Sequence, residues 1–132
     1  MANEHVKVEL TNSTGFPRDF TCADGTAIAK GALLKLTDPR TCIASVAEGE
    51  FTAGVASVDK VASDGQTFIP LWTDGIFKAT ASGSITAGQP VANAGSNKVE
   101  LMTSATASGA IQIGYALETA TNGETFLYRL RL

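Results

Sequence analysis

Charged side chains are scarce in this chain of 132 residues. They make up 17% of the sequence, whereas an average soluble domain has about 25%. Ten lysines and arginines stand against thirteen aspartates and glutamates, which gives a net charge of −3, and the basic residues form no run. Proteins that bind nucleic acid neutralise phosphates with clustered cations, so we expect no nucleic-acid partner. The hydrophobic share of 44% argues against a disordered chain, which needs low hydrophobicity and high charge.

Long apolar runs are missing too. No stretch holds the roughly 18 consecutive apolar residues that a membrane-spanning helix needs, so we expect no membrane partner. The first residues, Met1 to His5, contain no basic segment followed by an apolar run. We therefore expect no secretory signal and synthesis in the cytoplasm. The length predicts a single domain with a real core.

Histidine and cysteine are almost absent. His5 is the one histidine, and we expect it to be exposed to solvent because it lies among the first residues. Together with Cys22 and Cys42 it gives three candidate ligands, too few for a zinc site with four nitrogen or sulfur ligands. We predict that both cysteines are reduced, buried packing residues; a disulfide formed late in an oxidising setting is the alternative. No metal site is predicted.

Catalytic constellations are missing as well. A Ser-His-Asp or Cys-His site would have to use His5. The carboxylates of Glu48 and Glu50 flank Gly49 and indicate a solvated turn. No glycine motif precedes a helix in the way that a phosphate-binding loop requires. The sequence therefore predicts no enzyme, no catalytic residue and no cofactor.

Helical periodicity is the last major absence. No window with apolar positions at three-to-four spacing over ten or more residues is free of glycine and proline. Alternation with period two is common instead, and it is clearest between Phe126 and Leu132, where every second residue is apolar and shares one face. These patterns predict a mainly β fold with at most short helical turns, near residues 80–86 and 103–110. We expect strands at residues 6–10, 33–36, 51–58, 67–72, 76–79, 98–102, 111–119 and 125–132.

Four Asx-Gly pairs separate these strands. Both residues of such a pair tolerate positive φ, which suits tight turns. The pair Asp74-Gly75 lies between two apolar pairs and predicts a hairpin at that point. The other three pairs are Asp24-Gly25, Asp64-Gly65 and Asn122-Gly123.

Two parts of the chain echo each other. The segment Ala53-Gly54-Val55-Ala56 precedes an Asp-Gly turn and Thr67-Phe68-Ile69, just as Ile113-Gly114-Tyr115-Ala116 precedes an Asn-Gly turn and Thr125-Phe126-Leu127. Upstream, Ile28-Ala29-Lys30-Gly31 matches Ile85-Thr86-Ala87-Gly88. Matches in one order at offsets of 57 to 60 residues predict two related β units. Two units are too few for a solenoid, so we expect one small barrel or sandwich.

The first twenty residues predict an arm, followed by a β domain at residues 21–132. Val6, Val8 and Leu10 alternate with polar residues, and Phe16 and Phe20 follow a polar, glycine-containing stretch. Such an arm can add a strand to the sheet edge of another protein and place alternate side chains in its pockets. Pairing within the chain's own sheet is the alternative.

Trp72 is the one tryptophan in the sequence. Its simplest role is to anchor the core or one face of a sheet. The alternative is an interface anchor, because tryptophan is enriched where binding energy concentrates.

From residue 20 to the end, several motifs resemble tailed-virus capsid cement proteins, also called head decoration proteins. Each motif is weak alone, and the resemblance rests on their order and spacing. They are the run from Ala23 to Leu36, Ala53-Gly54-Val55-Ala56, Asp74-Gly75-Ile76-Phe77, the run from Ile85 to Val91, Ile113-Gly114-Tyr115-Ala116, and the run from Asn122 to Leu130.

The resemblance implies a non-enzymatic structural protein of the virion, made in the host cytoplasm. Members of this family bind the exterior of the expanded viral head, commonly as trimers, and clamp neighbouring major capsid proteins. Their N-terminal arms often pair with capsid strands, and the family has no catalytic, cofactor or metal residues to carry over. We therefore expect a capsid decoration protein whose partner is the major capsid protein. The expected contact residues are Val6, Val8, Leu10, Phe16 and Phe20.

Two other functions are open at this point. One is another structural β module of the virion, in the tail or baseplate. The other is a small-ligand-binding β barrel, which would need a pocket with convergent ionisable groups.

Overall fold

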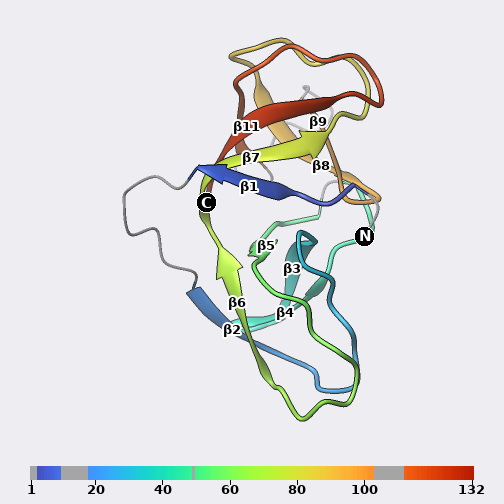
Figure 1. Ribbon diagram of the computed structural model, residues 1–132, viewed down its shortest axis with the longest axis vertical. Helices are drawn as coiled ribbons and strands as arrows, with labels where there is room; N and C mark the ends of the chain where they lie inside the picture. Colours follow the sequence, from blue (N-terminus) through green and yellow to red (C-terminus); the bar gives the residue numbers. More distant parts are fainter. Residues whose placement is uncertain (1–2, 10–17, 49, 103–111) are drawn as a thin grey trace.

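The computed structural model describes residues 3–9, 18–48, 50–102 and 112–132. These residues form eleven strands and contain no helix, which confirms the predicted mainly β fold (Figure 1). The strands are β1 (Val6–Glu9), β2 (Arg18–Cys22), β3 (Leu33–Asp38), β4 (Thr41–Ala44), β5 (Gly54–Ala56), β6 (Phe68–Trp72), β7 (Asp74–Thr80), β8 (Pro90–Gly95), β9 (Lys98–Leu101), β10 (Gln112–Ala116) and β11 (Thr125–Arg131).

The strands form two halves that stack along the long axis of the molecule (Figure 1). In the barrel half, residues 18–72, strands β2-β4-β3-β5-β6 close into a small barrel. In the sheet half, β1 and residues 74–132 form a six-stranded sheet in the order β1-β7-β11-β10-β8-β9. The chain passes from the barrel half to the sheet half at Thr73, the residue between the end of β6 and the start of β7.

The two halves repeat one strand arrangement, which confirms the predicted duplication. Neighbouring strands follow the order β2-β6-β5-β3-β4 in the barrel half and β7-β11-β10-β8-β9 in the sheet half. Cys22 pairs in parallel with Cys42 to close the barrel, and a parallel bridge joins Ala81 to Val99 at the equivalent place. Backbone hydrogen bonds recur as well, since Gly31 N donates to Ala56 O at 2.9 Å and Gly88 N donates to Ala116 O at 2.8 Å.

The last strands of the two halves, β6 and β11, align differently in the structure and in the sequence match. The two alignments differ by one residue. The sequence pairs Phe68 with Phe126, but Phe68 is 57% exposed and Phe126 is fully buried. In the ladders, Leu71 lies opposite Ala56 and Tyr128 lies opposite Ala116, so Ile69 is the structural equivalent of Phe126. A shift of one residue moves a strand's side chains to the other face, and burial therefore decides the true alignment.

The predicted face of β11 is confirmed: Phe126, Tyr128 and Leu130 are fully buried, whereas Leu132 lies past the strand and is exposed. Most buried side chains divide into two clusters, one in each half. Leu33 and Val55 of the barrel half belong to the cluster of the sheet half, and Trp72 packs against that cluster. The halves therefore share a continuous apolar contact.

Several predictions about the strands and turns are wrong. Asp74-Gly75 forms no hairpin, because both residues belong to β7 and pair with the end of β11. Strands β2, β4 and β8 were not predicted, and residues 80–86 comprise the end of β7, two isolated bridges and a bend but no helix. The predicted helical turn at residues 103–110 lies outside the described residues.

The start of the chain contributes a strand to the sheet half. Strand β1 pairs antiparallel with β7, so the alternative of pairing within its own sheet is confirmed for residues 6–9. Strand β2 begins at Arg18 and belongs to the barrel, so the predicted boundary at residue 20 falls inside a strand. Docking of this segment on another protein stays a prediction.

Candidate functional site

Strand β1 forms one edge of the six-stranded sheet, on the side that faces the barrel half (Figure 1). Val6 lies opposite Lys78 of β7, and the register shifts between Lys7 and Glu9, as in a β-bulge. Val6 is 46% exposed and Val8 is 51% exposed. Both valines are therefore accessible to a partner that approaches this edge strand.

His5 anchors this strand from a buried position and is only 2% exposed, so the prediction of a solvated histidine is wrong. Its Nε2 donates to the carbonyl oxygen of Asn97 at 3.1 Å, which leaves Nδ1 to accept the hydroxyl proton of Tyr128 at 2.7 Å. Burial lowers the pKa of His5 to about 4, against the opposing effect of the hydrogen bond to Asn97. The ring is therefore neutral and acts as a structural link.

Asn97 joins the N-terminal segment to both halves. It lies in the tight turn between β8 and β9, where Ser96 and Asn97 both have positive φ. Its side-chain oxygen accepts from Leu33 N at 2.8 Å, and its amide nitrogen donates to Asn3 O and Gly31 O, each at 2.9 Å. Sequence reasoning missed this residue; its one local signal is an Asx residue in a two-residue turn.

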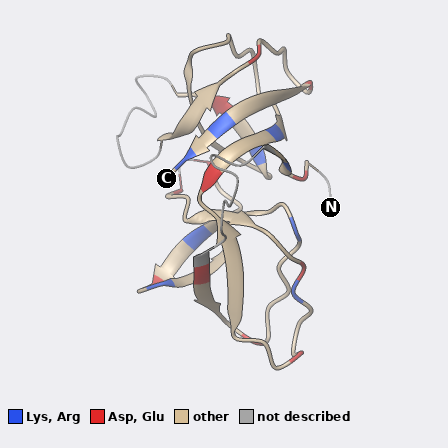
Figure 2. Cartoon of the chain, turned by 60° about the vertical axis from the view of Figure 1, so that its left-hand side comes forward, with Lys and Arg blue, Asp and Glu red and all other residues tan. Residues whose placement is uncertain are grey.

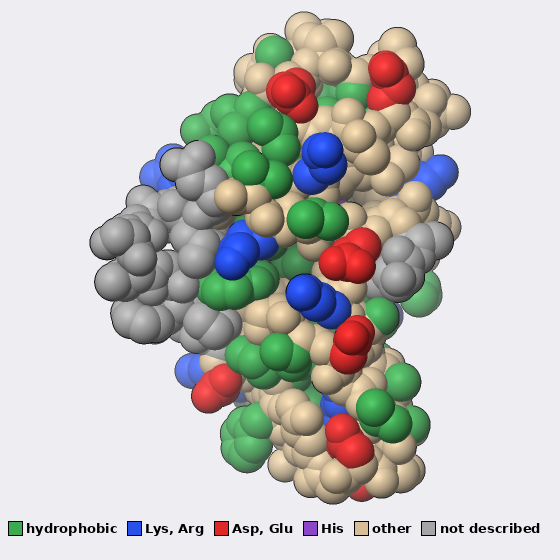
Figure 3. All heavy atoms as spheres, viewed as in Figure 1, with side chains coloured by type: hydrophobic (Ala, Val, Ile, Leu, Met, Phe, Trp, Pro, Cys, Tyr) green, Lys and Arg blue, Asp and Glu red, His purple; other side chains and the backbone are tan. Residues whose placement is uncertain are grey.

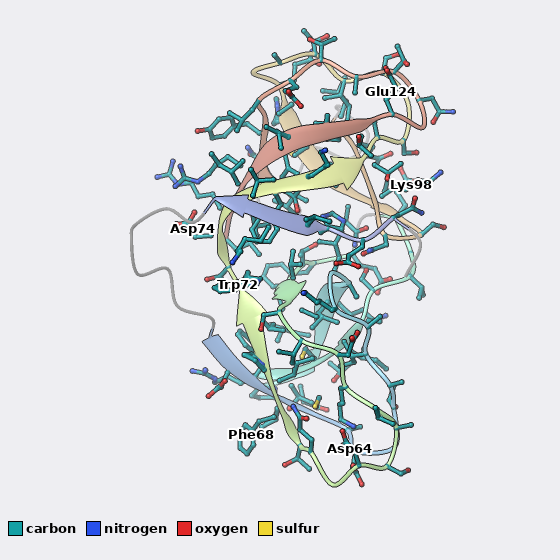
Figure 4. The ribbon with its side chains drawn as sticks, in the orientation of Figure 1. Asp64, Phe68, Trp72, Asp74, Lys98 and Glu124 are labelled. Atoms are coloured by element: carbon teal, nitrogen blue, oxygen red, sulfur yellow. The ribbon has the colours of Figure 1, made fainter. Side chains whose placement is uncertain are left out.

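Trp72 lies at the junction of the two halves (Figure 4). It packs against the core of the sheet half, and the Lys7 ammonium lies 5.4 Å from the centre of its ring. A cavity of about 190 Å³ opens between β1 and the barrel half, and its lining includes both side chains. The structure thus places Trp72 beside β1, and its role as an interface anchor stays a prediction.

The other predicted contact residues do not gather on one surface. Phe20 lies in β2, is partly buried against the barrel core, and is covered by the Arg40 guanidinium at 5.2 Å. Leu10 and Phe16 lie outside the described residues. Val6, Val8 and Trp72 are the predicted residues that the structure brings to the same edge.

The cysteines occupy packing positions. Cys22 and Cys42 are free and buried, and burial raises the pKa of both thiols, that of Cys42 to about 11. Raised values keep the thiols protonated and unreactive at neutral pH. Their structural equivalents in the sheet half are Ala81 and Val99, which agrees with a packing role.

Lys60 is a buried cation that links two loops of the barrel half. The Lys60 ammonium donates to the carbonyl oxygens of Asp24 and Val61, at 2.8 and 3.1 Å, and forms an ion pair with Asp64 at 3.3 Å. These bonds join two loops at the far end of the barrel and satisfy the charge of a fully buried side chain. The group therefore has a structural role.

No cluster of three or more His, Cys, Asp and Glu side chains within the described residues could hold a metal ion. The barrel interior is filled by fully buried side chains, among them Leu34, Ile69 and Leu71, which leaves no room for a ligand there. Charged groups of both signs lie scattered over both halves (Figure 2). Within the described ranges, no helix could span a membrane.

The model of the phage cement protein family matches residues 12–132. No curated protein matches the chain. Among solved structures, the chain is similar to the head fiber gp8.5 N base of bacteriophage phi29, with a TM-score of 0.56 and 19% sequence identity over 86% of this chain and 92% of that chain. At this identity the similarity shows the fold alone. Because the family model matches most of the sequence, the chain belongs to the phage cement protein family.

Proposed function

We propose that this protein binds the exterior of the expanded phage head and stabilises it without catalysing a reaction. The family match over residues 12–132 is the observation that supports this function. Two buried polar clusters among the described residues agree with it, because those at His5 and Lys60 are internal links with satisfied hydrogen bonds. The major capsid protein is the proposed partner.

The edge of β1 is the proposed contact with that partner. Val6 and Val8 are exposed on an edge strand, while His5 behind them is fixed by two buried hydrogen bonds. A fixed strand loses little conformational entropy when a partner covers it, which favours binding. Leu10, Phe16, Phe20 and Trp72 are proposed as further contacts, of which Trp72 lies beside β1.

A trimer would suit this function. Three copies that bind neighbouring capsid subunits together gain effective concentration, so weak individual contacts add to firm attachment. Contacts to several subunits at once would also clamp them against internal pressure. We propose this arrangement as the way in which the protein stabilises the head.

Binding to purified heads tests the function. The chain should co-sediment with expanded heads of the phage that encodes it and bind the compact precursor shell at least tenfold more weakly. Equal binding to both shells would contradict a role that depends on head expansion. Electron microscopy of the complex should then show added density on the head exterior; density on the tail or baseplate would contradict the proposal.

Point variants test the contact at β1. The double variant Val6→Ser and Val8→Ser should weaken binding to expanded heads about tenfold while the free protein keeps its melting temperature within a few degrees. Val61→Ser is the matched control, because Val61 is 67% exposed in a loop of the barrel half. Unchanged binding of the double variant would place the contact elsewhere.

A further inference from the structure

The internal duplication draws attention to one face of the sheet half, because the equivalent face of the barrel half is covered. In the barrel half, Val55 and Trp72 are register partners on β5 and β6, and both pack against the core of the sheet half. Their structural equivalents in the sheet half are Tyr115 and Arg129, which are register partners on β10 and β11. The face that joins the barrel half to its neighbour thus has a counterpart on the sheet half.

This counterpart is uncovered. Val55 is fully buried, whereas Tyr115 is 37% exposed. Beside Tyr115 lies an open hollow of about 400 Å³, which is also lined by Gln112, Gly114, Arg131 and Leu132. Leu132, which lines the hollow, is 47% exposed, and Leu117, at the other end of the ladder between β10 and β11, is 38% exposed. Partly exposed apolar side chains around a hollow are typical of a surface that receives another protein.

The charges on this face indicate the partner's chemistry. Outward-facing positions of β7 and β11 carry three cations and one acid, although the whole chain has a net charge of −3. The acid, Asp74, forms an ion pair with Arg129 at 3.0 Å, and Arg131 has no ion pair among the described residues (Figure 4 labels Asp74). The third cation is Lys78. Arginine and tyrosine are enriched at the centres of protein interfaces, because they combine apolar area with hydrogen-bond donors.

We infer that the face formed by Tyr115, Arg129, Arg131 and Leu132 docks on a protein surface that presents carboxylates around an apolar side chain. The apolar side chain fills the hollow beside Tyr115, and a carboxylate pairs with Arg131. The inference rests on the proposed function, since it takes the capsid protein as the occupant. It adds a contact on the sheet half, on a strand pair that does not include β1.

Substitutions on this face test the inference in the head-binding assay. Tyr115→Ser and Arg131→Glu should each weaken binding to expanded heads about tenfold or more, with a larger loss at low salt for Arg131→Glu. Lys98→Glu is the matched control, because it changes the net charge equally at a residue of β9 that does not line the hollow beside Tyr115 (Figure 4 labels Lys98). It should change binding less than twofold, and melting temperatures should confirm that all three variants fold.

Each outcome decides a different claim. If the unaltered chain and both face variants bind equally well, the inference is wrong and the proposed function stands. If the unaltered chain does not bind heads, both fail. A photo-crosslinking residue at position 115 identifies the occupant: a crosslink to the capsid protein on purified heads supports the inference, and a crosslink to a second copy of this chain overturns it.

Discussion

At Gly114 the backbone of β10 approaches β11 so closely that no side chain fits. A Cβ atom at this position would lie 1.7 Å from the carbonyl oxygen of Arg129, which is backbone and cannot move aside as a side chain can. Gly54, its equivalent in the barrel half, meets the carbonyl oxygen of Trp72 at 2.7 Å. The repeated glycine therefore reflects a repeated close approach of neighbouring backbones.

Gly114→Ala should consequently be costly. We expect it to lower the free energy of unfolding by about 3 kcal/mol, because the strand must shift to relieve the clash. Gly25→Ala is the matched control, since a Cβ there meets no atom within 4 Å. Chemical denaturation of both variants measures the difference. A loss below about 0.5 kcal/mol for Gly114→Ala would show that β10 tolerates the added carbon.

At the scale of the element, the duplication allows the positions of the two cysteines to be compared with the equivalent positions in the sheet half. The barrel half places Cys22 and Cys42 side by side on parallel strands, and the sheet half places Ala81 and Val99 there. All four side chains are buried. If the thiols only fill space, the residues of the sheet half should replace them.

The double variant Cys22→Ala and Cys42→Val should therefore change the free energy of unfolding by less than about 1.5 kcal/mol. The reversed pair, Cys22→Val and Cys42→Ala, is the control and should lose more, because it puts the larger side chain where the other half has alanine. Urea titrations with and without reductant provide the measurement. Sensitivity of the unaltered chain to reductant would instead indicate a disulfide between the two strands.

The sequence predicted most strands of this fold but not their partners. The alternation from Phe126 onward is local, and it was enough to identify β11 and its buried face. Strand β2 mixes charged, polar and apolar residues over five positions, and β4 has only four residues, so both lack such a signal. The hairpin expected at Asp74-Gly75 is absent because the ladder between β7 and β11 extends through both residues, and no local pattern contains that pairing.

The residues of the candidate site could likewise be predicted from the sequence only in part. The exposed valines of β1 could be found by alternation, because edge strands keep that pattern. His5 could not, since its partners Asn97 and Tyr128 lie 92 and 123 residues away in the sequence. A lone polar residue acquires its environment only when distant segments pack around it. The paired position of Trp72 and Lys7 likewise depends on how the two halves meet.

At the scale of the whole molecule, the halves are joined by both apolar and polar contacts. Leu33 and Val55 extend the core of the sheet half, and Asn97 binds the backbone of Leu33. The space-filling view shows the two halves in continuous contact at their junction (Figure 3). Buried ionisable groups contribute to this structure as well, and they make its stability depend on pH.

Two such groups titrate in opposite directions. His5 has a folded pKa of about 4 against 6.5 unfolded, so the unfolded chain binds its proton first and stability falls as pH drops from 6.5 to 4. Burial, together with the neighbouring Glu48, raises the pKa of Glu100 to about 7. The folded chain then holds this proton more tightly, so stability rises as pH drops from 7 towards 4.5. Between pH 6.5 and 4.5, therefore, the loss of stability from His5 and the gain from Glu100 oppose each other.

Glu100→Gln should therefore reveal the acid sensitivity of His5. The variant should be more stable than the unaltered chain at pH 8, because the amide removes a desolvated negative charge that lies beside Glu48. On acidification from pH 7 to pH 4.5, it should lose up to about 3 kcal/mol, whereas the unaltered chain should change little. Denaturation at each pH measures both curves, and His5→Gln added to Glu100→Gln should flatten the second. NMR titration of the His5 ring gives an independent check: a pKa near 6.5 in the folded protein would contradict its buried, neutral role.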